Sequence, residues 1–363
     1  DEEGYFPPKS PAMAGGGPSA IWSDGALTMA WAAWLNYADK RLLSELYPAI
    51  REYVWMLKAK YESEAPLWPG HFGDWLSSQV TIRPDAKDWQ DRGPAQIPKH
   101  ILQRLTLIHD ARLMERFAEV LGQEEDATEM AAFTKKLMAD PVIRGLRNKA
   151  PATGAQSAYA LSLGWDAALS SETEALVNRM VAAIEAYNGH LTTGTPSTTT
   201  LLNALSANGR HDLAWQLALK PEFPSFGFMV DNGATVLWER FDTYHPRMGF
   251  NPEPMNGLNH VGFCSVADWL FAHIAGIRPD PAQPGYKHFL IEPKLGGGLT
   301  SMKASYNSVR GRIESAYEIK NGELNLRVTI PPNTSATVIL PDDSHHAVES
   351  GQFEITIPIE GNT

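Results

Sequence analysis

Arg278-Pro-Asp-Pro281 marks the point where the hydrophobic pattern of this sequence changes. Before it, apolar residues recur at steps of three and four, which is the period of an amphipathic helix. After it, they recur at every second position, which is the period of a strand with one buried face. The change predicts a helical domain over residues 1–278 and a β domain over residues 279–363.

The helical pattern predicts roughly nine helices before residue 278. Two of them are expected at residues 43–60 and 99–121. The apolar stripe of the first consists of Leu43, Leu46, Ile50, Val54 and Leu57. Loops over residues 62–98, 188–198 and 221–261 concentrate aromatic and charged side chains. Long loops on a helical scaffold are usually functional.

The β part carries a hairpin signal at Asn321-Gly322, a pair typical of a type I′ turn. Tyr317 and Ile319 alternate before it. On its far side the alternating residues are Leu324, Leu326, Val328 and Ile330. Further strands are expected at residues 336–340 and 353–359, so the pattern predicts a small β-sandwich of about 80 residues.

The composition is that of a globular protein, with 43% hydrophobic and 20% charged residues among 363. A formal charge of −11 argues against nucleic acid and against an anionic membrane as partners. Cys264 is the only cysteine, so an internal disulfide and a cysteine metal site are excluded. No apolar run reaches the ~18 residues of a membrane span, and we expect a soluble chain whose compartment the sequence does not reveal.

Aromatic residues are abundant and include 11 tryptophans. The C–H face of a pyranose stacks on such rings while its hydroxyls bond at the rim, so the composition favours a sugar ligand. The run Ala234-Thr-Val-Leu-Trp-Glu-Arg-Phe-Asp242 sets Glu239 between Trp238 and Arg240. Apolar neighbours perturb the pKa of a carboxyl and a cation favours its charged form, which suits an acid or base acting on a sugar. The alternative is that Trp238 and Phe241 are core residues and that Glu239 and Arg240 form a solvated pair.

The run Gly73-Asp-Trp-Leu76 puts an acid and a large ring in one loop. Trp75 would serve as a platform on which a ligand stacks. The structural alternative is that Asp74 forms a turn or caps a helix.

A similar pair stands in Ile21-Trp-Ser-Asp-Gly25. Asp24 is expected to cap the helix that the pattern predicts over residues 26–37. Trp22 lies on the loop side of that cap, where a ligand can reach it.

Gly189-His-Leu-Thr-Thr-Gly194 combines small residues with a histidine. Glycines let a backbone approach a ligand closely. His190 is therefore a candidate ligand contact, with a turn histidine as the alternative. The sequence around it holds no second histidine at metal-ligand spacing, so no metal is expected there.

A series of segments, taken in order, resembles the α-L-rhamnosidases of glycoside hydrolase family 78. They are Trp22-Ser-Asp24, Phe72-Gly-Asp-Trp75, Gly189-His-Leu-Thr-Thr-Gly194, Ala234 to Asp242, Met255-Asn256 with Asn259-His260, Ala275-Gly-Ile-Arg-Pro-Asp280 and Ala304-Ser-Tyr-Asn-Ser-Val-Arg-Gly311. The resemblance covers almost the whole chain, and the ordered set is more specific than any single segment.

The resemblance implies an (α/α)6 barrel followed by a C-terminal β-sandwich. It also implies hydrolysis of terminal α-L-rhamnosides with inversion at the anomeric carbon. Glu239 matches the general base of the family, the carboxylate that activates the attacking water. His260 matches a histidine that lines the sugar site, and Trp22 and Trp75 match aromatic residues around the rhamnose.

Asp74 and His190 lie within matching segments and are further candidate substrate-binding residues. Inversion needs two carboxyl groups roughly 6.5–9.5 Å apart, with a water between the base and the anomeric carbon. Arg240 would help to keep the base ionised if it faces Glu239. Neither a cofactor nor a metal is expected.

The sequence departs from the family at its start. The general acid of the family lies in a motif rich in Asp and Glu, before the segment that matches Trp22, and Asp1, Glu2 and Glu3 do not match that motif. The barrel is therefore expected to lack its first helices here. Either this chain is a fragment, or a second, N-terminal polypeptide completes the barrel and supplies the acid. Loss of general acid catalysis costs roughly 10²–10⁴-fold in rate, so little hydrolysis is expected from this chain alone.

Two other functions stay open from the sequence. Another (α/α)6 glycosidase would keep Glu239 and differ in sugar specificity. A carbohydrate-binding fragment without catalysis would keep the aromatic loops. The sequence does not choose among flavonoid, saponin and pectic substrates. It also leaves open the oligomeric state and the compartment, whether periplasmic, extracellular or cytoplasmic.

Overall fold

The structure is a computed structural model that describes residues 3–9, 17–70, 72–77, 97–148, 155–247, 249–252 and 255–359. The chain splits into two compact units. The first unit comprises residues 1–30, 41–204 and 217–264, and the second comprises residues 31–40, 205–216 and 265–363. The domain boundary predicted at residue 278 stays a prediction, because residues 31–40 and 205–216 are grouped with the C-terminal part.

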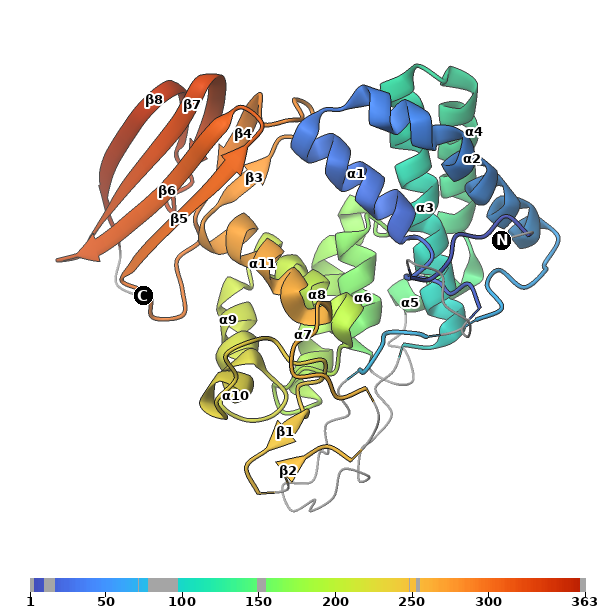
Figure 1. The fold of residues 1–363 in the computed structure, drawn as a ribbon, viewed down its shortest axis with the longest axis horizontal. Coiled ribbons are helices and arrows are strands. Elements are labelled where there is room, and N and C mark those ends of the chain that lie inside the picture. Colours follow the sequence, from blue (N-terminus) through green and yellow to red (C-terminus); the bar gives the residue numbers. More distant parts are fainter. Residues whose placement is uncertain are drawn as a thin grey trace. The chain divides into compact units, whose positions relative to one another are not determined.

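Helices make up most of the chain before residue 275 (Figure 1). Their bounds are α1 Gly25–Tyr37, α2 Lys40–Glu62, α3 Lys99–Leu121, α4 Glu124–Met138, α5 Pro141–Asn148, α6 Gln156–Gly164, α7 Thr173–Glu185, α8 Thr195–Ala207, α9 His211–Leu219, α10 Phe226–Asp231 and α11 Val266–Trp269, with single turns at Ser170–Glu172, Gly262–Ser265 and Leu270–Ile274. The patterns at residues 26–37, 43–60 and 99–121 correspond to α1, α2 and α3. The described residues contain more helices than predicted because α10 and α11, with 6 and 4 residues, are too short to show a period.

Helix α3 is buried on nearly every side. It packs against α4, α5 and α6, and Figure 1 shows α3 and α4 running side by side. Leu105, Ile108 and Phe117 are all fully buried. A helix buried all round carries apolar residues beyond a single stripe. One buried residue of α3 is an acid, Asp110.

The cap that the sequence predicted from Asp24 is wrong, because its carboxylate turns away from α1. Asp24 Oδ2 accepts the N–H of Ile21 at 2.7 Å. Asp24 Oδ1 accepts the hydroxyl hydrogen of Tyr53. The first turn of α1 bonds to the Asp24 carbonyl instead, which lies 3.0 Å from the N of Leu27. Buried donors therefore take this side chain away from the helix end.

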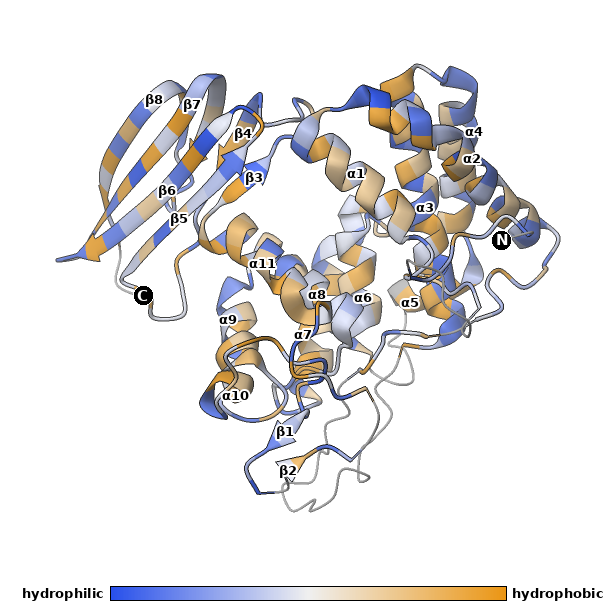
Figure 2. Cartoon of the chain, viewed as in Figure 1, coloured by the Kyte–Doolittle hydropathy of each residue, from blue (hydrophilic) through white to orange (hydrophobic). Residues whose placement is uncertain are grey.

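Six strands of the second unit form one sheet in the order β3-β4-β7-β6-β5, with β8 also paired to β7. Their bounds are β3 Ile277–Pro279, β4 His288–Ile291, β5 Ser301–Ser308, β6 Gly311–Lys320, β7 Glu323–Ile339 and β8 His345–Pro358. All pairs are antiparallel except β4 with β7. Figure 2 shows apolar and polar residues alternating along these strands.

Strand β7 serves two halves of this sheet because a bulge interrupts it between Ile330 and Ser335. Before the bulge it pairs with β6, and after the bulge it pairs with β4. Alternate residues of both stretches, including Leu326 and Val338, face one hydrophobic core. The two halves of the sheet therefore enclose a single core.

The hairpin predicted at Asn321-Gly322 is confirmed. It joins β6 to β7, and Lys320 pairs with Glu323 across it. Both turn residues are left-handed, with φ of 54° at Asn321 and 79° at Gly322. A type I′ turn requires positive φ at both positions, and asparagine and glycine tolerate it best.

We predict that Leu326→Ala lowers the free energy of unfolding of the β part by about 2–5 kcal/mol, because it leaves a cavity in the core that both halves share. Denaturant unfolding measures the loss. Leu169→Ala is the matched control, since Leu169 is exposed. Its effect should stay within about 0.5 kcal/mol. Equal losses in the two variants would contradict the shared core.

Candidate functional site

Glu239 lies in a loop of the first unit, and its carboxylate is fixed by the backbone of Gly257. The N–H of Gly257 donates to Glu239 Oε2 at 2.8 Å. In return, the N–H of Glu239 donates to the Gly257 carbonyl at 2.9 Å. The residue is 8% exposed. These two bonds hold the carboxylate in one orientation, with Oε2 committed to the backbone.

His260 faces the other carboxylate oxygen of Glu239. Its Nε2 lies 3.8 Å from Glu239 Oε1, and its Nδ1 accepts the N–H of Gly262 at 3.0 Å. Because Nδ1 is an acceptor, the proton of the neutral ring is on Nε2, on the side of the carboxylate. A separation of 3.8 Å is too long for a hydrogen bond. A water or a sugar hydroxyl can therefore bridge the two groups.

Arg240 does not pair with Glu239. Its Nε donates to Asp242 Oδ1 at 2.8 Å, and its Nη2 donates to Asp242 Oδ2 at 3.3 Å. The forked guanidinium thus satisfies both oxygens of a buried carboxylate. Arg240 therefore does not face Glu239 in the way that the sequence interpretation required, because its guanidinium is paired with Asp242.

The aromatic residues beside Glu239 belong to the core. Phe241 packs against Phe263 with ring centroids 4.2 Å apart. Trp238 meets Tyr244 edge to face at 6.4 Å. The core alternative therefore holds for these rings, whereas the solvated pair of Glu239 and Arg240 does not form.

Trp22, Phe72 and Trp75 form a cluster of edge-to-face rings. Their centroids are 5.5, 5.8 and 6.3 Å apart. The indole N–H of Trp22 donates to the Gly73 carbonyl at 3.1 Å, which joins the two loops. Trp22 and Trp75 are half-buried. Each ring thus keeps an accessible part that can meet the face of a sugar.

Asp74 is buried in the same loop. Its Oδ2 accepts the N–H of Gly194 at 2.8 Å and the hydroxyls of Ser157 and Ser197. Burial raises the pKa of Asp74, and these donors oppose the rise. Asp74 therefore fastens the tryptophan loop to α6 and to the start of α8.

The start of α8 lies between the tryptophan loop and the His260 turn. The N–H of Thr195 donates to the Trp75 carbonyl at 2.9 Å. On its other side, a methyl group on Gly262 would lie 3.1 Å from Thr195 Cβ. The structure therefore brings together candidates from four separate sequence motifs within the first unit.

Glycine is required at position 194 by close packing of backbone on backbone. A Cβ there would lie 2.4 Å from the carbonyl oxygens of both Asp74 and Trp75. Such a distance is far inside van der Waals contact. The glycine that the sequence suggested for close approach to a ligand is used here for close approach to another loop.

His190 is held in a turn. Its Nδ1 lies 3.1 Å from the Tyr187 carbonyl, and its own carbonyl accepts Gln156 Nε2 at 2.8 Å. Gln156 Oε1 also accepts the N–H of Thr192 at 3.0 Å. Burial and the Lys220 charge lower the pKa of His190. These bonds fit the turn interpretation, and a role of His190 toward a ligand stays a prediction.

Sequence reasoning missed the residues that support the candidates rather than the candidates themselves. They are Gln156, Ser157, Ser197, Gly257 and Gly262. The pair Asn256-Gly257 is a turn signal, and the run from Thr195 to Thr200 is rich in hydroxyls. Gly257 and Ser197 could therefore have been found from the sequence. Nothing in the sequence around Ser157 marks it, because its partner lies in a distant loop.

The described ranges contain no group of three or more His, Cys, Asp or Glu side chains placed to hold a metal ion. The same ranges contain no helix that is long and apolar enough to cross a membrane.

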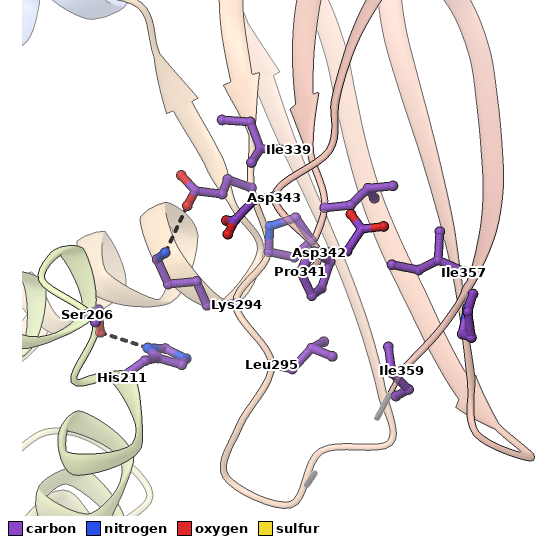
Figure 3. Close-up of a pocket in the computed structure, with 15 residues that line it drawn as sticks. Ser206, His211, Lys294, Leu295, Ile339, Pro341, Asp342, Asp343, Ile357 and Ile359 are labelled. Atoms are coloured by element: carbon purple, nitrogen blue, oxygen red, sulfur yellow. Dashed lines mark hydrogen bonds and ion pairs between the residues drawn. The ribbon is translucent and has the colours of Figure 1, made fainter. Parts of the chain in front are cut away.

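A cavity of about 830 Å³ lies within the second unit, with Ser206 and His211 on its wall (Figure 3). His211 Nδ1 lies 2.8 Å from the Ser206 hydroxyl, and His211 Nε2 accepts the indole N–H of Trp215 at 3.0 Å. Because Nε2 accepts, Nδ1 carries the proton and donates it to the serine. His211 therefore cannot take a proton from Ser206, and this pair is structural rather than a nucleophile with its base.

Two family models match the chain. The bacterial α-L-rhamnosidase 6 hairpin glycosidase domain matches residues 1–274, and the bacterial α-L-rhamnosidase C-terminal domain matches residues 276–354. The chain belongs to the bacterial α-L-rhamnosidase family. Over 349 residues it is 32% identical to an α-L-rhamnosidase of Streptomyces avermitilis. The matched stretch covers 96% of this chain and 32% of that protein.

Solved structures of the family share this architecture. The S. avermitilis α-L-rhamnosidase complexed with L-rhamnose matches with a TM-score of 0.84 and 28% identity, over 98% of this chain and 35% of that one. The Aspergillus terreus α-L-rhamnosidase matches with a TM-score of 0.82 and 25% identity, over 98% of this chain and 41% of that one. The predicted fold class, a helical barrel domain followed by a β domain, is confirmed. The chain spans about a third of the length of the curated relatives that it matches.

We predict that Gly194→Ala lowers the free energy of unfolding by about 1–3 kcal/mol, because the added methyl group forces the Asp74 and Trp75 backbone away. Thermal unfolding with near-ultraviolet circular dichroism reports the stability and the tryptophan packing. Gly145→Ala is the matched control, because a Cβ at Gly145 meets nothing within 4 Å. The proposed packing would be refuted if the two variants unfolded alike.

We predict that stability falls as the pH drops from about 6.5 toward 4, partly because of His211. Burial lowers the pKa of His211 to about 4 from its ordinary value of 6.5. The native state therefore binds fewer protons than the unfolded state in this interval, and its stability is lost as the pH falls through it. His211→Gln should lose less stability than the wild type between pH 7 and about 4.5. The exposed His345→Gln is the control, and a wild-type slope in His211→Gln would contradict the prediction.

Proposed function

We propose that this chain is the base-bearing part of an inverting α-L-rhamnosidase that removes terminal α-L-rhamnose from glycosides or polysaccharides. One observation carries the proposal: Glu239 is held by the Gly257 backbone with its second oxygen turned to His260. The relative that was solved with L-rhamnose supports the choice of sugar.

In the proposed reaction, Glu239 Oε1 takes a proton from a water as the water oxygen attacks the anomeric carbon. The Gly257 N–H holds Glu239 Oε2, which leaves Oε1 to accept the water proton. The Nε2–H of His260 donates a hydrogen bond to that water or to a neighbouring sugar hydroxyl. The bond to the leaving oxygen breaks on the opposite face, and a general acid protonates that oxygen.

Trp22 and Trp75 would hold the sugar by stacking on its C–H face and covering its 6-deoxy methyl group. Burying one such methyl contributes roughly 1–3 kcal/mol of selectivity. Asp74 contributes by fixing the Trp75 loop, since its Oδ2 is already bonded to Gly194. His190 would stand at the edge of the sugar site.

The reaction also needs a second carboxyl, roughly 6.5–9.5 Å from the base. Two buried acids of this region are engaged elsewhere, Asp74 by Gly194 and Asp242 by Arg240. We propose that the acid is supplied from outside these residues, either by a longer form of this polypeptide or by an N-terminal partner. The span of about a third of the curated relatives is consistent with this proposal.

We predict that Glu239→Gln lowers kcat of the full-length gene product at least about 10²–10⁴-fold, because the amide cannot accept the water proton. Release of nitrophenol from an aryl α-L-rhamnoside measures the rate, and calorimetry with L-rhamnose should show binding retained. Glu125→Gln, on the exposed surface of α4, is the control. A kcat near that of the wild type would remove Glu239 from the role of base.

The same assay separates the alternatives when this chain is compared with the full-length gene product. The proposal is supported if only the longer form hydrolyses the substrate and proton NMR shows a first product whose anomeric configuration is inverted. Retained rhamnose binding without turnover in both would instead identify a carbohydrate-binding fragment. Turnover of a different aryl glycoside would identify another (α/α)6 glycosidase.

A further inference from the structure

Two buried carboxyls face each other in the first unit. Asp110, in the middle of α3, is 0% exposed, and Asp24, just before α1, is 3% exposed. Among the described residues, neither oxygen of Asp110 receives a hydrogen bond from a backbone or side-chain donor. The Asp24 carboxyl lies within hydrogen-bonding reach of the Asp110 carboxyl. Since an ionised carboxylate only accepts, such a bond exists only when one of the two carries a proton.

The surrounding donors decide which carboxyl is ionised. Asp24 already accepts the Tyr53 hydroxyl at one oxygen and the Ile21 N–H at the other. The Tyr53 hydroxyl in turn accepts the indole N–H of Trp68 at 3.0 Å. Bonds from several donors stabilise the charged form of an acid. Burial raises the pKa of Asp24 as well, but its donors oppose that rise, so they favour Asp24 as the carboxylate and Asp110 as the neutral acid that donates to it.

Among the described residues, the titratable groups that face this pair offer no positive charge. Asp24 comes from the start of α1, Asp110 from α3 and the Tyr53 hydroxyl from α2. Tyr5, from the N-terminal segment, packs its ring against Tyr53 with centroids 6.4 Å apart. No salt bridge to either carboxyl is found among the described residues. Burial and the Asp24 charge raise the pKa of Asp110 well above its ordinary range, which agrees with a retained proton.

The ionised Asp24 holds a strained turn. Ile21, a β-branched residue, has a φ of 69°, and such residues rarely adopt a left-handed backbone. The bond of 2.7 Å from its N–H to Asp24 helps to offset that strain. The next residue is Trp22, whose ring lies in the cluster with Phe72 and Trp75.

We propose that Asp110 is a positioning residue, which keeps one proton for Asp24 so that Asp24 can hold the Ile21–Trp22 turn and present Trp22 to the sugar. Asp110 on α3 shares its proton with Asp24, and Asp24 accepts the N–H of Ile21. Ile21 directly precedes Trp22, so the turn sets the position of the indole ring. The part of this proposal that concerns sugar rests on the proposed function. The proton and the turn do not.

The test compares Asp110→Asn with Asp110→Ala. The amide of Asp110→Asn donates permanently to Asp24, whereas Asp110→Ala leaves Asp24 without that donor. Hydrogen exchange of the peptide spanning residues 17–23 should quicken about tenfold in Asp110→Ala and stay near wild type in Asp110→Asn. A peptide from α7 serves as an internal reference. Equal exchange of residues 17–23 in Asp110→Ala and the wild type would overturn the positioning role.

A second measurement reads the proton directly. The infrared band of a protonated carboxyl should be present in the wild type at neutral pH, absent from Asp110→Asn and unchanged in the exposed control Asp231→Asn. With a raised native pKa, the stabilisation from this proton is complete below the ordinary carboxyl range of about 4 and is lost as the pH rises. The Tm of Asp110→Asn relative to the wild type should therefore increase with pH. A missing band together with a constant difference in Tm would refute the shared proton.

Kinetics separate this proposal from the proposed function. In an active full-length enzyme, Asp110→Ala should raise KM about tenfold with a smaller effect on kcat, and Asp110→Asn should restore KM. An enzyme that proves inactive on rhamnosides would defeat the proposed function alone, because the exchange and infrared results would still decide the role of Asp110. A fall in kcat with unchanged KM in Asp110→Ala would count against positioning.

Discussion

The hydrogen bonds of the buried Asp74 carboxylate hold together the parts of the first unit that the candidate site is made from. One oxygen gathers donors from Gly194, Ser157 and Ser197, which belong to segments far apart in the sequence. A carboxylate withdrawn from water without such donors would be strongly destabilising. The loop therefore has one favourable position, and the neighbouring bond from Thr195 to the Trp75 carbonyl makes it the position of the tryptophan as well.

Three acids near the site are stabilised by three different means. The guanidinium of Arg240 pairs with Asp242, the backbone of Gly257 bonds to Glu239, and in our proposal the proton of Asp110 serves Asp24. These arrangements differ in what they leave accessible. The fork on Asp242 occupies both oxygens, whereas Glu239 has one oxygen on the backbone and the other turned to a histidine. A general base needs that combination of fixed orientation and a reachable lone pair.

Sequence periodicity located the regular elements because their signals are local. The stripe in α2 and the Asn321-Gly322 turn depend on neighbours within a few residues, so they could be predicted. The partners of charged side chains could not be predicted in the same way. The position of Asp24 before α1 predicted a helix cap, but its carboxylate accepts the Ile21 N–H and the Tyr53 hydroxyl instead. Asp110 gave no signal, since a lone acid in a helical pattern usually means a solvated position.

The candidate site shows the same division. Motifs found Glu239, His260 and the two tryptophans, and the structure places them within one unit; their roles stay predictions. Their supports are backbone groups and small hydroxyls, whose importance arises only from contacts made over long sequence distances. Arg240 illustrates the limit even at short range, because its pairing with Asp242 depends on which way the loop turns.

The parallel pairing of β4 with β7 affects the order in which the β part can assemble. His288 and Ser335, which this pairing brings together, are 47 residues apart, and pairings over such distances form slowly. β8 then pairs with β7 on both sides of the bulge, and the pair at the end of this ladder is Pro358 with Glu323. On a ribosome, the growing chain therefore cannot close this core until residue 358 has emerged. Until then, β7 lacks its β8 partner, and an apolar strand exposed in this way is prone to aggregate.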